Sequence, residues 1–124
     1  MSSEKVSFNI SVVDLGKIHM LVDKGVYTNR TDFITKAILN ELNRNEDVIE
    51  QTKDKNDFAI GIMKYSRDDV EKMILENKKM TVHVLGMLIL DKTIDLELAQ
   101  SAFNKIVVFG KYMGPHDIKE YFKI

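Results

Sequence analysis

The chain has 124 residues, 44% of them apolar, and its 18 basic and 19 acidic residues give a formal net charge of −1. This length suggests one domain or two very small ones, and the charge excludes a binder that holds nucleic acid through bulk positive charge. The lack of cysteine excludes disulfides, cysteine-ligated zinc sites and thiol nucleophiles. The N-terminus has no signal-peptide pattern and no apolar run reaches membrane-spanning length, so we expect a cytoplasmic protein.

Residues 5–11, with the sequence KVSFNIS, alternate strictly between polar and apolar side chains. A period of two is typical of a β-strand with one exposed face and one buried face. The apolar members are Val6, Phe8 and Ile10, and the polar members are Lys5, Ser7 and Asn9. A helix signal follows at once, so the segment has no nearby second strand with which to form a hairpin.

The first helix is expected over about residues 12–24. Ser11 is a suitable N-cap, and Asp14 stands three residues later, close to a capping box. Apolar residues then recur at helical spacing, at Leu15, Ile18, Leu21 and Val22. Gly25 occupies the position after a helix at which glycine is most common.

A second helix is expected over about residues 30–44, with a pattern that extends to about residue 51. Asn29 is its N-cap, and an acidic residue, Asp32, again follows three positions later. Its apolar stripe consists of Phe33, Ile34, Ala37, Ile38 and Leu42. Residues 44–57 are charged and nearly free of large apolar residues, so they are interpreted as a solvated helix end and a linker.

The remaining residues alternate between strand and helix patterns. Strands are expected over 58–65, 80–90 and 106–113. Helices are expected from a cap at Ser66 to about Asn77, after a cap at Asp95 with Ala102 and Phe103 included, and after Pro115. Such alternation favours a parallel sheet with right-handed crossovers.

Three glycines interrupt the three strand segments at similar positions. Gly61, Gly86 and Gly110 are separated by 25 and 24 residues, and a helix pattern follows each. This spacing indicates a degenerate β-α repeat of about 25 residues. The alternative is a plain βαβαβα domain in which the glycines coincide.

The N-terminal strand needs a partner for its backbone groups, and the same strand of a second copy is the simplest one. Two antiparallel copies form a ribbon that fits the major groove of DNA. With the helices and the connecting sequence GVYTNRTDFI, residues 4–44 resemble the ribbon-helix-helix DNA-binding proteins, the class of the Arc and MetJ repressors. The NRTDF segment is most similar to the nickel-responsive repressors, where a glycine is followed by Asn-Arg-Ser-Glu; Thr31 and Asp32 here replace the Ser and Glu.

The resemblance implies a role for three groups of residues. Bases would be contacted by Lys5, Ser7 and Asn9, and DNA phosphates by Asn29, Arg30 and Thr31. The dimer core would contain Val6, Phe8, Ile10, Leu15, Ile18, Val22, Phe33, Ile34, Ala37, Ile38 and Leu42. Without the resemblance, the polar strand face would be an ordinary solvated edge of a sheet. The charge of residues 1–44, with six basic against five acidic side chains, neither supports nor excludes a DNA partner.

Neither a metal site nor a catalytic site is expected. His19, His83 and His116 lie in different predicted elements, and none has a second histidine at metal-binding spacing. The chain has no phosphate-binding glycine loop and no recognisable Ser/His/Asp arrangement. We therefore expect neither enzymatic activity nor a cofactor.

The sequence thus predicts an α+β protein in three parts. Residues 1–44 form a ribbon-helix-helix domain that dimerises and binds double-stranded DNA, 45–57 a charged helix extension or linker, and 58–124 a β-α domain. The last part is interpreted as an assembly module that forms tetramers or larger oligomers, or as a binder of a small effector. The main function expected is that of a repressor; alternatives are an antitoxin whose C-terminal half binds a toxin, and a non-DNA interaction protein that kept the fold.

Overall fold

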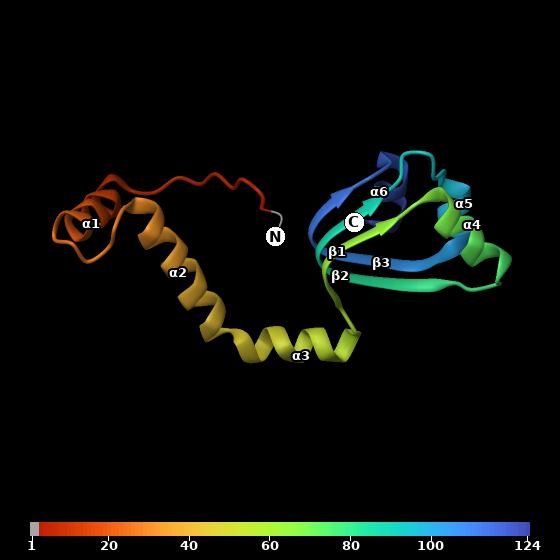
Figure 1. The fold of residues 1–124 in the computed structure, drawn as a ribbon, viewed down its shortest axis with the longest axis horizontal. Helices are drawn as coiled ribbons and strands as arrows, with labels where there is room; N and C mark the ends of the chain where they lie inside the picture. Colours follow the sequence, from red (N-terminus) through yellow and green to blue (C-terminus); the bar gives the residue numbers. More distant parts are fainter. Residues whose placement is uncertain (1–2) are drawn as a thin grey trace. The chain divides into compact units, whose positions relative to one another are not determined.

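The computed structural model describes residues 3–124, and it consists of two compact units. The first unit extends to Ile49, and the second comprises Glu50–Ile124. The first contains helices α1 (Val12–Asp23) and α2 (Arg30–Arg44), and helix α3 (Glu46–Asn56) runs across the division. Figure 1 shows the course of the chain through these elements.

Helix α1 begins and ends where its capping residues predict. The Ser11 hydroxyl oxygen accepts a hydrogen bond of 3.1 Å from the Asp14 amide. At the other end, the Gly25 amide donates to the Val22 carbonyl at 3.0 Å, and the following amide donates to the Leu21 carbonyl at 2.9 Å. This pair of bonds is a Schellman motif, which satisfies carbonyls that the helix itself leaves unpaired.

The second helix does not continue to residue 51, because it ends at Arg44 and α3 starts anew at Glu46. Asn45 adopts a non-helical conformation between them, with φ −107° and ψ 15°. The charged stretch expected as a helix end and linker is therefore mostly helix. Glu46 and Asp47 lie in its first turn, and Lys53 and Lys55 in its last, positions that complement the helix dipole.

The segment 3–11, which includes the predicted strand, pairs with no other strand in the single chain. The described residues 3–11 belong to no helix or strand. Their apolar side chains are exposed, with Val6 at 78% and Phe8 at 62%. The physical reason is that a lone edge has neither backbone partners nor a core until another strand is supplied.

The second unit is a three-stranded parallel sheet in the order β1-β2-β3, which confirms the predicted parallel arrangement. Its elements are β1 (Ala59–Tyr65), α4 (Arg67–Leu75), β2 (Met80–Leu90), α5 (Leu96–Ala102), β3 (Phe103–Met113) and α6 (His116–Phe122). The third strand begins at Phe103 rather than at residue 106, so the helical assignment of Phe103 is wrong. A bulge at the start of the β2–β3 pairing, where Thr81 pairs with Lys105, accommodates the additional residue.

One face of this sheet carries the core. Buried side chains of β2 and β3 pack with Val70 of α4, Ala99 of α5 and Ile118 of α6 in a single cluster. All three helices therefore cover the same face, as right-handed crossovers between strands in sequential order require. In Figure 1 the strands curve together, with these helices on the concave side.

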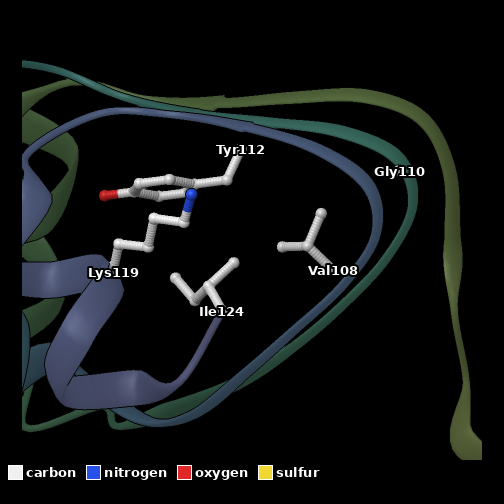
Figure 2. A pocket seen from close by; sticks show the side chains of 5 residues that line it. All are labelled: Val108, Gly110, Tyr112, Lys119 and Ile124. Carbon is white, nitrogen blue, oxygen red and sulfur yellow. The ribbon is translucent and has the colours of Figure 1, made fainter. Parts of the chain in front are cut away.

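The three glycines lie side by side across the sheet. Gly61 is in register with Gly86, and Gly86 with Gly110. All three have positive φ, at 110°, 137° and 130°. The chain bends near Gly110 (Figure 2). The shared register and conformation of the three glycines favour the interpretation of the β-α units as equivalent repeats.

Candidate nucleic-acid interface

The extended segment before α1 presents its predicted base-contacting residues to solvent. Lys5, Ser7 and Asn9 are all exposed in the single chain. They alternate with the equally exposed Val6 and Phe8, so both sides of the segment are uncovered. Along the segment, the hydrogen-bonding side chains thus alternate with apolar ones.

The second element of the site is the N-terminus of α2. The Asn29 side-chain oxygen accepts a hydrogen bond of 2.8 Å from the Asp32 amide, as an N-cap does. The amides of Arg30 and Thr31 make no hydrogen bond within the described residues, and both side chains are exposed. Unpaired amides at the positive end of a helix are a suitable anion site.

The Asp32 carboxylate, next to the N-terminus of α2, interacts with Thr28 and Lys36. The Thr28 amide donates to Asp32 at 3.0 Å, and Lys36 lies 3.2 Å from the same carboxylate. The Thr28 hydrogen bond, followed by that of Lys36, lowers the pKa of Asp32 below its ordinary value. Asp32 is therefore ionised at neutral pH, and Lys36 compensates its charge beside the proposed phosphate position.

The turn into α2 is further ordered by an aromatic contact that the sequence reading missed. The rings of Tyr27 and Phe33 meet edge to face at 5.0 Å, and the Lys36 ammonium lies 5.5 Å from the Tyr27 centroid. The only signal in the sequence is that two aromatic residues, Tyr27 and Phe33, stand six positions apart on either side of the predicted helix start. This contact fixes the approach of the chain to Asn29.

The predicted dimer core is largely uncovered in the single chain. Within residues 3–49, Ile18 is the one buried residue, at 5% exposure. Ile38 and Leu42 of α2 are exposed, as are the apolar residues of the extended segment. Two helices and a free segment with one buried side chain have too little core to be stable alone, which indicates that another chain covers this surface.

Comparison with known protein families decides the identity of this arrangement. The model of the ribbon-helix-helix transcriptional regulator family matches residues 1–119. The chain belongs to this family. The match extends over both units of the ribbon-helix-helix protein, beyond the N-terminal part on which its sequence resemblance was based. No curated protein and no solved structure gave a significant match.

As a member of this family, the chain is a DNA-binding transcriptional regulator. Members of the family are regulators rather than enzymes, and they usually dimerise. None of the helices in the described part of this ribbon-helix-helix protein is long and apolar enough to cross a membrane. Likewise, residues 3–124 contain no cluster of three or more potential metal-binding side chains. Among the histidines, His83 lies against Phe58 at 5.1 Å, and His116 is 3.0 Å from Glu120.

The second unit of the regulator has a small hollow on the concave side of its sheet (Figure 2). It measures about 100 Å³, and it is lined by Val108, Gly110, Tyr112, Lys119 and Ile124. The Tyr112 hydroxyl donates to the Pro115 carbonyl at 2.9 Å. Burial, and secondarily Asp117, raises the pKa of Tyr112 to about 12, so the hydroxyl remains protonated. This volume is well below the roughly 300 Å³ at which typical small-molecule pockets begin.

Proposed function

We propose that the protein is a repressor that binds operator DNA as a homodimer through an antiparallel ribbon of two N-terminal segments in the major groove. The observation that carries this proposal is the uncovered apolar stripe of Val6 and Phe8 beside an almost coreless helix pair. Pairing with the same segment of a second chain satisfies the strand backbone and covers that stripe. The polar sides of both strands then face the groove.

In this arrangement Lys5, Ser7 and Asn9 read the bases. An asparagine amide forms a bidentate pair with adenine, a lysine ammonium suits guanine O6 and N7, and serine is adaptable. Each chain contributes the same three side chains, so the recognised sequence is two-fold symmetric. The exposure of all three residues in the single chain supports this role.

The N-terminus of α2 holds a phosphate beside the ribbon. The unbonded amides of Arg30 and Thr31 bind the phosphate oxygens, and the Arg30 guanidinium adds a direct charge contact. Asn29 maintains the helix start through its bond to the Asp32 amide. These contacts fix register and orientation, whereas the ribbon supplies sequence preference.

Because these DNA contacts all lie in the first unit, we assign different roles to the two units. We assign DNA binding and dimerisation to residues 1–44, connection to 45–57, and assembly to 58–124. For this last part we favour assembly over effector binding; the hollow that it contains measures only about 100 Å³. A packed core in the second unit also supports a regulator over an antitoxin, whose toxin-binding segment is typically polar and disordered when free.

Selection of bound DNA from a random pool tests the proposal. The expected result is an enriched, two-fold symmetric sequence whose half-sites are repeated in register with the helical turn of DNA. A pool that stays unenriched after repeated rounds at moderate salt would contradict the DNA-binding role. Enrichment of an asymmetric sequence would contradict the ribbon of two identical strands.

A further inference from the structure

The sheet of the second unit has a second face that helices α4, α5 and α6 leave uncovered. Its apolar side chains alternate with the core residues along the strands, and we call this set the open face. It consists of Ile60, Ile62, Leu85, Met87, Val107 and Phe109. None of the six belongs to the buried core cluster or is packed against it. All-parallel sheets are almost always covered on both faces, so a second layer is expected here.

Basic residues border the open face at both ends. By the same alternation, Lys105 lies on this face beyond the apolar rows at one end, whereas Lys111 and Lys64 lie at the other. The three strands contain no aspartate or glutamate. In the described part of the chain, Lys64 and Lys105 form no ion pair. The Asp91 carboxylate, in the turn after β2, accepts hydrogen bonds from the Thr93 amide and hydroxyl instead. The face therefore has an apolar centre and a basic rim.

One corner of the open face is already covered by an aromatic side chain. The Phe58 ring, which precedes β1, stacks on Phe109 with the centroids 5.2 Å apart and an interplanar angle of 14°. The same ring lies 5.1 Å from that of His83. The isoleucines of β1 stay uncovered, with Ile60 65% exposed and Ile62 52% exposed. The space left for a partner is therefore over β1 and β2, between the two basic ends.

The chemistry of this face selects among possible occupants. A second copy of the face would bring two basic rims together, because no strand carries an acid. DNA supplies negative charge but no apolar surface for Ile60 and Ile62, and the Phe109 ring, on which a base would stack, is already stacked with Phe58. Protein interfaces combine an apolar centre with a polar rim. The open face therefore suits a protein surface on which apolar residues lie between acidic ones.

A helix is the element that most often covers a parallel sheet. Lys105 and Lys111 are six residues apart on β3, which is roughly 20 Å of strand and equals about 13 residues of α-helix. No helix in the described part of this chain supplies the surface. Helices α4, α5 and α6 pack on the other face, and α3 has only Val48 and Ile49 as apolar residues. The apolar sides of α1 and α2 are assigned to the proposed dimer.

We infer that the open face binds an amphipathic helix of a different protein, in which aspartates or glutamates flank an apolar stripe. The stripe covers Ile60, Ile62 and the centre of β2, and the acidic residues pair with Lys64 and Lys105 at the two ends. This inference goes beyond the proposed DNA binding and uses it only to assign α1 and α2 to the dimer. Assembly of the second unit with copies of itself then takes place through another surface.

A designed peptide is the probe for this face. It is a labelled helix of about 14 residues, with leucines at i, i+3, i+4 and i+7 spacing and glutamates on both sides of them. The matched control peptide carries lysine in place of each glutamate. Fluorescence anisotropy with the full chain is expected to show about tenfold tighter binding of the acidic peptide at low salt, a difference that decreases as salt is added. Equal binding of the two peptides, or no binding of the acidic one, would overturn the inference.

Charge reversal tests the basic rim. Lys64→Glu with Lys105→Glu, the rim variant, is expected to bind the basic peptide more tightly than the acidic one. The matched control is Lys72→Glu with Lys119→Glu, the same change of charge at exposed lysines of α4 and α6. The control should keep the preference for the acidic peptide. Reversal in both proteins would assign the effect to net charge and contradict a specific face.

Substitution of two isoleucines tests the apolar centre. Ile60→Ser with Ile62→Ser is expected to weaken binding of the acidic peptide about tenfold, whereas Leu75→Ser, at a position 84% exposed on α4, should leave it unchanged. Unaltered binding by the isoleucine variant would overturn the inference, because the lysines alone would then hold the peptide. Circular dichroism checks the fold. If the serine pair unfolds the unit, the rim variant decides, since both of its substitutions are at exposed side chains.

Two further measurements identify the other occupants. Light scattering without peptide would place a second copy on the face if the isoleucine variant had a lower mass than both the wild type and Leu75→Ser. Titration with random-sequence DNA would place DNA there if the rim variant had a smaller salt slope than the Lys72→Glu, Lys119→Glu control. Either result would overturn the inference, and equal masses and equal slopes are expected.

DNA selection separates this inference from the proposed function. The rim variant is expected to enrich the same DNA sequence as the wild type. If the wild type enriches no DNA but the peptide preference still reverses in the rim variant, the DNA-reading proposal fails and the open face stands. If DNA is enriched but the two peptides bind equally, the reverse holds.

Discussion

A Cβ atom on Gly86 would lie 2.2 Å from the carbonyl oxygen of Gly61, its register partner on the neighbouring strand. The same position has a φ of 137°, which side chains rarely tolerate. Gly61 has a φ of 110° but open space around its Cβ position. An added side chain would therefore strain the backbone at both positions, but it would collide with the neighbouring strand only at Gly86.

We expect Gly86→Ala to lower the free energy of unfolding by about 2–6 kcal/mol, the sum of strain at positive φ and overpacking. Gly61→Ala serves as the matched control and should cost only about 1–3 kcal/mol, from strain alone. Urea unfolding followed by circular dichroism measures both. Equal losses for the two variants would show that the collision between neighbouring strands contributes nothing.

Much of the fold was predictable because local rules and tertiary packing agree. The caps at Ser11, Asn29 and Ser66 all form the expected side-chain bonds. The glycine spacing indicated repeated β-α units, and the glycine row across the parallel sheet agrees with that interpretation. Phe103 was misassigned because an apolar residue at helical spacing after Ala102 fits either element. Its place at the start of β3 is set by pairing with Met80, which the local sequence does not contain.

The exposure of Ile60 and Phe109 on the sheet was not predictable from the sequence for a related reason. The strand 80–90 is apolar at almost every position, a pattern that predicts burial on both sides. It cannot indicate whether the second layer comes from the same chain or from another. The candidate DNA site is similar, since the alternation of residues 5–11 predicts a half-buried strand but its partner lies outside the single chain.

Replacement of Asn9 by alanine is expected to weaken binding to selected DNA by roughly 1–3 kcal/mol, the contribution of a good bidentate base contact. Binding to random DNA should change little, because the loss concerns sequence readout. Gel-shift titrations on both DNAs measure the difference. The matched control is Asn40→Ala, the same change at an exposed position of α2, which should leave both affinities unaltered. Equal losses on selected and random DNA would remove Asn9 from the base-reading set.

Replacement of Arg30 by alanine is expected to weaken binding to all sequences alike. One lost phosphate contact reduces the slope of log affinity against log salt by about one. Arg44→Ala is the control, because Arg44 lies at the other end of α2 in an exposed ion pair with Glu41. A salt titration of both variants decides the matter, and an unchanged slope for Arg30→Ala would exclude that side chain from the phosphate contacts.

Acidification is expected to destabilise the second unit partly through the cap of α4. The Ser66 amide donates to the Asp69 carboxylate at 2.8 Å, and the Asp69 amide donates back to the Ser66 hydroxyl oxygen at 3.1 Å. The backbone bond, followed by the side-chain bond, lowers the pKa of Asp69 below its ordinary value of 3.8. A depressed folded-state pKa stabilises the fold above the ordinary value, and that stabilisation is lost as the pH falls through the folded pKa.

Thermal unfolding of Asp69→Asn between about pH 7 and pH 2 tests this cap. The variant should melt below the wild type at neutral pH, and the gap should narrow as the pH falls below the ordinary carboxyl value of 3.8. Asp68→Asn is the matched control, one residue away in the same first turn and outside the capping box. It should follow the wild-type curve. A constant gap between wild type and Asp69→Asn at every pH would mean that the carboxylate charge does not contribute, and that the cap acts through geometry alone.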